Sequence, residues 1–335
     1  MTESRVMIRC ERLSKMYGPN RAVNDISFDV RSGEILGFLG PNGAGKTTTM
    51  KMITCFLAPT SGRIEVAGHD AQAHSLEVRR NIGYLPEDTP LYRDMTVLEY
   101  LEYAMELRGV PHRDRRPRIK KIGEVTGVLA VLGRQIGELS KGFRQRVGLT
   151  QAIVHDPAIL ILDEPTSGLD PNQIVEIRAL IKELGREKTV ILSTHILPEV
   201  TATCDRVVII SDGKLVADGR PEDLVARERG NKYRLLLESD GGEPDAAVQA
   251  KLRALEGVRE VSQETSESGT AQFAVVSDGG RDLRRDLFRC VVDNKWPLLE
   301  LERREASLEE VFGKLTRSDA GAAPKGPLAR TEKAA

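Results

Sequence analysis

The hydrophobic pattern changes along the chain from alternation to unbroken apolar runs. Residues 22–30 alternate between apolar and polar side chains, which predicts a half-buried antiparallel strand. Residues 35–39 and 159–162 are apolar without interruption, and residues 189–195 read as another buried strand that ends in a histidine. Unbroken runs of this length are typical of strands buried on both faces of a parallel sheet. The first two thirds of the chain are therefore predicted to be α/β.

A glycine-rich stretch separates the run 35–39 from a helical pattern over 48–53. Strand, glycine-rich loop, Lys-Thr and helix form the P-loop pattern of proteins that bind nucleoside triphosphates. Glycines let successive backbone N–H groups point at phosphate oxygens, and the helix N-terminus adds a partial positive charge. The predicted phosphate-binding residues are Gly40, Pro41, Asn42, Gly43, Ala44, Gly45, Lys46 and Thr47.

Polar side chains follow the other buried strands. Asp163 and Glu164 come at the end of the run that starts at residue 159, and His195 ends the next strand. In open α/β sheets this end of the strands is where ligands bind. Further along the pattern, Ser140 is predicted to cap a helix that runs through residue 153, and Pro86 and Pro90 place Glu87 in a loop.

Together these motifs resemble the nucleotide-binding subunits of ABC (ATP-binding cassette) transporters over about residues 5–229. The sequence Leu-Ser-Lys-Gly at 139–142 stands at the position of the family signature, and Ser-Gly-Leu-Asp at 167–170 stands at the D-loop. The resemblance implies a P-loop NTPase cassette with a RecA-like core, an antiparallel β subdomain and an α-helical subdomain. It also implies ATP hydrolysis with Mg²⁺.

Roles follow from the resemblance residue by residue. Glu164 is expected to act as general base, with Lys46 and His195 as further catalytic residues. Thr47, Asp163 and Glu87 are the expected Mg²⁺ ligands, the carboxylate of Asp163 through water. The remaining expected ATP contacts are Tyr17, which would stack on adenine, Thr48, Glu87, Ser140, Gly142 and Asp170. A lone Tyr near a turn also fits a packing role.

The same resemblance implies partners. A second copy of the chain would supply the signature to the ATP held by the first P-loop, which gives a head-to-tail homodimer with two ATP molecules. A separate membrane permease would use the free energy of ATP hydrolysis. The form Tyr-Leu-Pro-Glu at 84–87 is similar to exporters with ABC-2-type permeases, among them gliding-motility-associated and multidrug efflux ATPases. The expected location is cytoplasmic, on the inner face of the cell membrane.

Two motifs depart from the family pattern. Lys141 replaces a glycine in the signature, and Phe143 replaces a glutamine, while the donors of Ser140 and Gly142 are kept. Glu87 replaces the usual glutamine of its loop, and an ionised carboxylate cannot donate a hydrogen bond.

Composition and charge limit the classes of function and partner that fit the sequence. Acidic and basic residues balance to a net charge of −1, so no strongly basic face is implied and nucleic acid is not an expected partner. The four cysteines are far apart, and no apolar run approaches the ~20 residues of a membrane span. One alternative is a soluble ABC ATPase that acts on ribosomes or DNA, but such relatives usually carry two cassettes or a long insertion. Another is an ATP-dependent scaffold without hydrolysis, against which the presence of Glu164 and His195 argues.

The last third of the chain predicts a smaller domain. Strand and helix patterns follow in the order β-α-β-β-α-β over residues 230–317, which is typical of a ferredoxin-like fold. A contact with the dimer or permease, a structural appendage and ligand sensing all stay open for this domain. The Ala-, Gly-, Pro- and Lys-rich residues 318–335 are expected to form a disordered tail.

Overall fold

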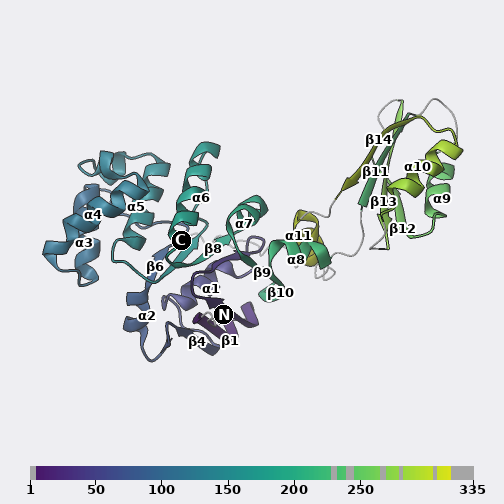
Figure 1. Ribbon diagram of the computed structural model, residues 1–335. Coiled ribbons are helices and arrows are strands. Elements are labelled where there is room, and N and C mark those ends of the chain that lie inside the picture. The colour runs from purple at the N-terminus through teal and green to yellow at the C-terminus, as the bar shows by residue number, and fades with distance from the viewer. Residues whose placement is uncertain are drawn as a thin grey trace, which may run out of the picture. The chain divides into compact units, whose positions relative to one another are not determined.

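The computed structural model describes residues 5–227, 232–238, 245–264, 269–278, 282–304 and 308–317 (Figure 1). It divides into two compact units. One unit runs to Pro221 and takes in the chain from Phe312, and the other spans Glu222–Val311. The predicted domain boundary at residues 229–230 and the predicted tail 318–335 lie outside the described residues, so both stay predictions.

A six-stranded sheet organises the first unit. Its strand order is β10-β9-β3-β8-β7-β6, in which the five strands from β9 to β6 are parallel and β10 pairs antiparallel with β9. The strands are β3 (Ile35–Leu39), β6 (Ile82–Leu85), β7 (Ile159–Asp163), β8 (Thr189–Thr194), β9 (Arg206–Ser211) and β10 (Lys214–Gly219).

Both faces of this sheet are covered, which explains the unbroken apolar runs. Ile159 and Ile161 of β7 belong to one hydrophobic cluster, while Leu160 and Leu162 belong to another on the opposite face. Every residue of β7 is buried. The strand therefore has no solvent face and no need for polar positions before its last residue.

A second, antiparallel sheet contributes to the first of these clusters. Its order is β2-β1-β4-β5, and the alternation predicted over residues 22–30 is confirmed, with Val23, Ile26, Phe28 and Val30 buried. The strands are β1 (Val6–Tyr17), β2 (Asn20–Arg31), β4 (Ser61–Val66) and β5 (His69–Asp70).

Helices complete the unit. Helices α3, α4 and α5 gather beside the central sheet around their own apolar cluster (Figure 1). A capping box of Thr96 and Glu99 starts α3, and the predicted cap Ser140 starts α5. The helices are α1 (Lys46–Ile53), α2 (Ser75–Asn81), α3 (Val97–Leu107), α4 (His112–Thr126), α5 (Lys141–Ile153), α6 (Pro171–Gly185) and α7 (Leu197–Thr203), with 3-10 turns at Leu129–Val131 and Ile136–Glu138.

The second unit follows the predicted element order. Its antiparallel sheet has the order β12-β13-β11-β14, and its core joins alternate residues of β11, Tyr233, Leu235 and Leu237, to apolar positions of α9 and α10. The elements are β11 (Lys232–Glu238), α9 (Asp245–Arg253), β12 (Val258–Gln263), β13 (Thr270–Ser277), α10 (Arg284–Asp293) and β14 (Leu298–Arg304). The unit boundaries fall within α8 (Pro221–Arg227) and α11 (Leu308–Arg317).

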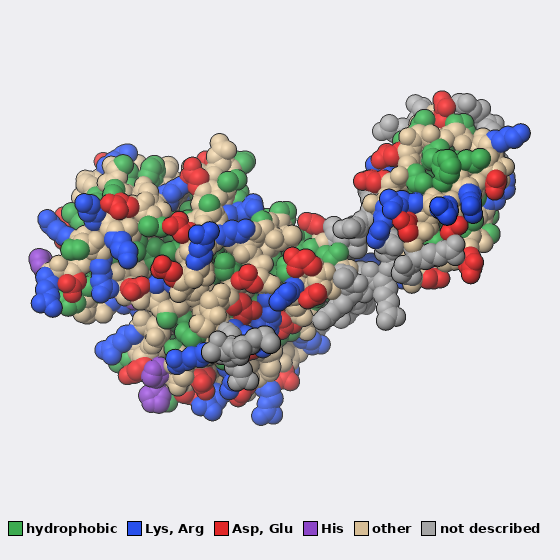
Figure 2. Space-filling model, viewed as in Figure 1, with side chains coloured by type: hydrophobic (Ala, Val, Ile, Leu, Met, Phe, Trp, Pro, Cys, Tyr) green, Lys and Arg blue, Asp and Glu red, His purple; other side chains and the backbone are tan. Residues whose placement is uncertain are grey.

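Charges of both signs are mixed over the surface in view. Lys and Arg side chains lie among Asp and Glu side chains on the face that Figure 2 shows. In the part of the chain that the structure describes, no helix is both long and apolar enough to cross a membrane.

Candidate functional site

The glycine-rich loop joins the carboxyl end of β3 to α1. A Cβ atom on Gly40 would lie 2.4 Å from the carbonyl oxygen of Ile210, and a Cβ atom on Gly45 would lie 2.4 Å from that of Ala22. Gly45 also caps α1 with a φ of 106°, in the region that favours glycine. Both positions therefore require glycine, because the loop backbone lies against the neighbouring strands.

Lys46 is the first residue of α1, and its side chain folds back over the loop. Its Nζ donates hydrogen bonds to the carbonyl oxygens of Gly40 at 2.7 Å and Pro41 at 3.3 Å. The first turn of α1 carries no acidic residue, so nothing offsets the positive end of the helix dipole. The loop thus presents backbone N–H groups and a buried ammonium to an anion. The remaining predicted residues of the loop and first turn are Asn42, Gly43, Ala44, Thr47 and Thr48.

Glu164 lies beside this loop, immediately after β7. It is 4% exposed, and one carboxyl oxygen lies 3.5 Å from Lys46 Nζ. His195, which follows β8, places Nδ1 at 3.0 and 2.9 Å from the two oxygens of Glu164. This distance means that Nδ1 donates to the carboxylate, which leaves the other ring nitrogen for a further partner. The structure thus brings the three predicted catalytic residues together.

The backbone of Glu164 is strained. Its φ of 48° is in the left-handed region, which costs a non-glycine residue about 1–3 kcal/mol. Its N–H donates to the carbonyl oxygen of Ser193 in β8 at 2.9 Å, and its carbonyl accepts from the N–H of Ser167 at 3.1 Å. Such a conformation persists only where the surroundings hold it, and it turns the carboxylate toward Lys46 and His195.

Asp163 is the last residue of β7 and is fully buried. Neither carboxyl oxygen has a hydrogen-bond partner in the described chain. Burial raises the pKa of this carboxyl, while the hydroxyls of Ser193 and Thr47 and the ammonium of Lys46 lie near enough to oppose that shift. Unsatisfied hard oxygens beside the Thr47 hydroxyl fit a Mg²⁺ ion, which takes few protein ligands and keeps several waters.

The signature and the D-loop segment lie against each other. A Cβ atom on Gly142 would lie 2.6 Å from the side chain of Gln173, and a Cβ atom on Gly168 would lie 2.0 Å from Lys141 Nζ. Asp170 caps α6 by accepting from the N–H of Gln173 at 2.9 Å. Ser140, which caps α5, and Asp170 are both exposed, so the two segments present polar groups to a ligand or partner.

Two predicted contacts lie at the margins of this region. Tyr17 ends β1 and is 48% exposed, with Lys15 Nζ 5.6 Å from its ring centroid. Glu87 is exposed in the loop after β6, as the two prolines predict. Both side chains are accessible, and their contacts with ATP or Mg²⁺ stay predictions.

Glu199 of α7 is a site residue that the sequence did not indicate. It is 2% exposed, and its two carboxyl oxygens accept hydrogen bonds from the hydroxyls of Thr166 and Thr194. A glutamate in a short apolar helix gives one sequence signal, a charge among buried positions. That signal does not indicate a partner, because Thr166 follows β7 whereas Thr194 ends β8.

Comparison with known proteins places the chain in a family. The family model described as ABC transporter matches residues 23–167. The ABC transporter ATP-binding protein YxlF of Bacillus subtilis (strain 168) is 35% identical, over 93% of this chain and 100% of that protein. The chain belongs to the ATP-binding proteins of ABC transporters.

Other ABC proteins are similar over nearly the full length. The bacitracin transport ATP-binding protein BcrA of Bacillus licheniformis is 34% identical over 92% of this chain and 97% of its own. The Nod factor export ATP-binding protein I of Burkholderia orbicola (strain AU 1054) is 35% identical over 91% and 95%.

Solved structures agree with the predicted fold. A structure of an ATP-binding subunit of an ABC transporter matches with a TM-score of 0.61 and 30% identity, over 66% of this chain and 92% of that one. A dimeric structure of MJ0796, a bacterial ABC transporter cassette, matches with a TM-score of 0.60 and 25% identity, over 64% and 98%. The predictions of an ABC cassette and of an ATP-binding, ATP-hydrolysing transport subunit are confirmed.

Proposed function

We propose that Glu164 is the general base of this ABC ATPase and that Lys46 and His195 are its catalytic partners. The observation that carries the proposal is the cluster of these three side chains beside the glycine-rich loop. A carboxylate accepts the proton of the attacking water, and a neighbouring ammonium and imidazole keep that carboxylate oriented. The products are ADP and phosphate.

The loop and the first turn of α1 would hold the phosphates. Their backbone N–H groups and Lys46 neutralise charge on the β- and γ-phosphates. Thr47 and Asp163 would hold Mg²⁺, with Glu87 as a further oxygen ligand from its exposed loop. The ion, when bound, supplies positive charge at the phosphate oxygens. Tyr17 would stack on the adenine base, and Thr48 would complete the contacts of the first turn.

A second copy of the chain would complete the site. Ser140, Gly142 and Asp170 lie in the paired signature and D-loop segments rather than in the glycine-rich loop. The exposed N-terminus of α5 is suited to a phosphate that another copy holds. The dimeric structure of the similar MJ0796 cassette supports this arrangement.

A separate permease would use the free energy of ATP hydrolysis for transport. The relatives named for bacitracin transport and Nod factor export support a role in export. An ABC-2-type permease, as in gliding-motility-associated or multidrug efflux systems, is the partner that the loop at 84–87 favours. Binding to that permease would hold the subunit on the inner face of the membrane.

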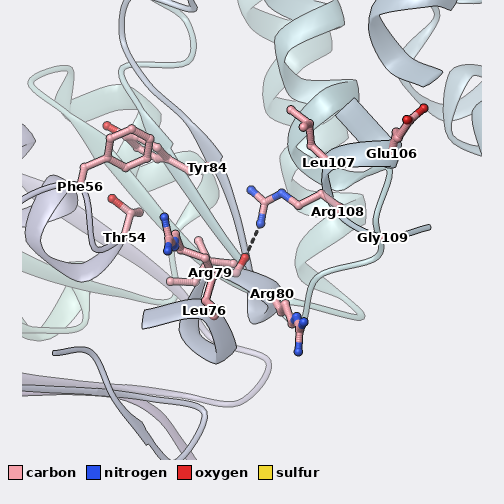
Figure 3. Close-up of a pocket in the computed structure, with 11 residues that line it drawn as sticks. Thr54, Phe56, Leu76, Arg79, Arg80, Tyr84, Glu106, Leu107, Arg108 and Gly109 are labelled. Atoms are coloured by element: carbon pink, nitrogen blue, oxygen red, sulfur yellow. Dashed lines mark hydrogen bonds between the residues drawn. The ribbon is translucent and has the colours of Figure 1, made fainter. Parts of the chain in front are cut away.

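A groove of about 510 Å³ on the first unit offers a docking surface for that permease. Figure 3 shows the side chains of Arg79, Arg80 and Arg108 at this groove, with Arg108 donating to the backbone carbonyl oxygen of Arg79. Within the described residues none of these three arginines forms an ion pair with a carboxylate. Exposed Phe56 and Leu107 add apolar surface, and the carboxylate of Glu106, which also lines the groove, is paired with Arg115. The groove therefore fits an amphipathic cytoplasmic segment that carries carboxylates.

The test is steady-state ATP turnover of the full-length chain and its Glu164→Gln variant. Replacing the base should lower kcat by about 100-fold or more while ATP still binds. Glu187→Gln, an exposed glutamate of the same unit, is the matched control and should keep normal turnover. Normal turnover in Glu164→Gln would contradict the assignment of Glu164 as the general base.

A further inference from the structure

Glu199 joins two segments that the sequence keeps apart. Thr166 Oγ1 donates to one of its carboxyl oxygens at 2.5 Å, and Thr194 Oγ1 donates to the other at 2.9 Å. Glu199 is 2% exposed, and it has no ion pair in the described parts of the chain. A buried carboxylate is tolerated only when its oxygens are hydrogen-bonded, so both hydroxyls are needed to stabilise it.

The two threonines lie next to the catalytic side chains. Thr166 follows Glu164 by two residues, and Thr194 directly precedes His195. The Thr194 hydroxyl also accepts from the N–H of Ile196 at 3.1 Å, so the same group shapes the turn that carries His195. One buried carboxylate therefore contacts both loops that meet in the Glu164–His195 hydrogen bond.

Glu164 needs such support. Its positive φ stores strain, and its N–H is fixed on one side by the Ser193 carbonyl. The turn after it closes through the N–H of Ser167, and Thr166 lies within that turn. The hydrogen bond from Thr166 to Glu199 fixes this turn at a further point and ties it to Thr194, the last residue of β8.

We infer that Glu199 is a positioning residue for ATP hydrolysis, which holds the Glu164 carboxylate and the His195 imidazole at their working distance. It acts through Thr166 and Thr194 and does not touch ATP. The inference rests on the roles proposed above for Glu164 and His195. Within the described residues no hydrogen bond joins Glu199 to the glycine-rich loop, so loss of the Glu199 carboxylate should slow the chemical step and leave nucleotide binding in place.

The primary experiment measures kcat and KM for ATP with full-length Glu199→Ala and Glu199→Gln. Glu199→Ala should lower kcat about 10- to 100-fold, the effect of a misplaced catalytic group, with KM within about twofold. Glu199→Gln should fall between Ala and wild type, because an amide keeps one acceptor oxygen.

The matched control is Asp205→Asn. Asp205 is an exposed residue whose carboxylate accepts from the backbone N–H of Ile35 at 2.8 Å, at the amino end of β3. Asp205→Asn should lower Tm but keep kcat within about twofold of wild type. If Glu199→Ala lowers kcat no more than Asp205→Asn does, Glu199 is merely structural and the inference is wrong.

Two isosteric variants test the same link without removing the carboxylate. Thr166→Val and Thr194→Val each delete one donor, and each should lower kcat with KM kept. If Glu199→Ala does not fold, these two threonine variants test the inference in its place. Wild-type kcat in both threonine variants would overturn the inference. In a His195→Ala background, Glu199→Gln should cost less than it does alone, whereas fully additive losses would contradict a role through His195.

The outcome for Glu164→Gln separates this inference from the proposed function. Normal turnover in Glu164→Gln would contradict the assignment of Glu164 as the general base, regardless of the results for the Glu199 variants. If Glu164→Gln loses turnover while the Glu199 and threonine variants keep normal kcat, only the positioning role of Glu199 is contradicted.

Discussion

Asp163 shows at the residue scale how a site retains an unfavourable charge. Its carboxyl oxygens are buried without hydrogen-bond partners, and burial raises the pKa of the group. The folded protein therefore holds this proton to higher pH than the unfolded chain does. The contribution of Asp163 to stability is favourable at low pH and is lost as pH rises from about 3.9, the ordinary pKa of Asp, through the raised pKa of the folded state.

Asp163→Asn should consequently stabilise the protein without Mg²⁺ at pH 7. The amide has the shape of the carboxyl but carries no charge, and a gain of about 1 kcal/mol would raise Tm by about 2–4 °C. Thermal melting from pH 4 to pH 8 should show less loss of stability with rising pH in the variant. The stabilisation by added Mg²⁺-ATP should shrink. A lower Tm than wild type at pH 7 without Mg²⁺ would contradict this account.

The sequence alone predicted the residues that a local pattern places. The glycine-rich loop, Asp163, Glu164 and His195 each lie at the carboxyl end of a buried strand, so the apolar runs were enough to predict that they meet at one edge of a parallel sheet. Glu199 was missed because its function comes from two hydroxyls, one 33 residues earlier and one five residues earlier in the chain. No local pattern states that those loops meet.

At the scale of elements, the groove at Arg79, Arg80 and Arg108 could not be predicted from local sequence patterns either. Its residues come from the end of α1, from α2 and β6, and from the end of α3. The capping box that begins α3 is a local pattern, but no local pattern tells which elements adjoin the carboxyl end of α3. Burial and the neighbouring Arg79 lower the pKa of Arg108, which shows that like charges are held close together at this groove.

Reversing charge in the groove should uncouple the subunit from the membrane. Arg79→Glu combined with Arg80→Glu would repel a segment that carries carboxylates, at a cost of several kcal/mol for like charges in contact. The full-length variant should lose co-sedimentation with membranes of cells that contain the permease, while its ATP turnover in solution stays within about twofold.

Arg113→Glu is the control for that experiment, because this arginine is exposed on α4 and does not line the groove. It should sediment like wild type. Retained sedimentation of the groove variant at physiological ionic strength would exclude the groove as the docking surface. Loss with Arg113→Glu as well would show a general effect of net charge.

At the scale of the whole molecule, the predicted ATP-site residues of one chain fall into two groups. The glycine-rich loop, Glu164 and His195 form one group of contacts, and the signature and D-loop segments form another, joined to each other through Gly142 and Gly168. A head-to-tail pair would bring the second group of each copy to the first group of the other. The side chain of the exposed cap Ser140 accepts from the N–H of Phe143 at 3.3 Å, and no other partner of this hydroxyl lies in the described residues, so its oxygen stays accessible to a phosphate.

Glu164→Gln should therefore dimerise when Mg²⁺-ATP is bound. ATP at the interface adds binding energy to the pair, and without hydrolysis that energy is not released. Light scattering after size exclusion should give twice the monomer mass with Mg²⁺-ATP and the monomer mass without nucleotide. Adding Ser140→Arg to this variant should leave ATP binding in each loop but prevent the pair, because a bulky side chain would occupy the site of the partner's phosphate. A Glu164→Gln protein that is saturated with ATP and still monomeric would show that each chain works alone.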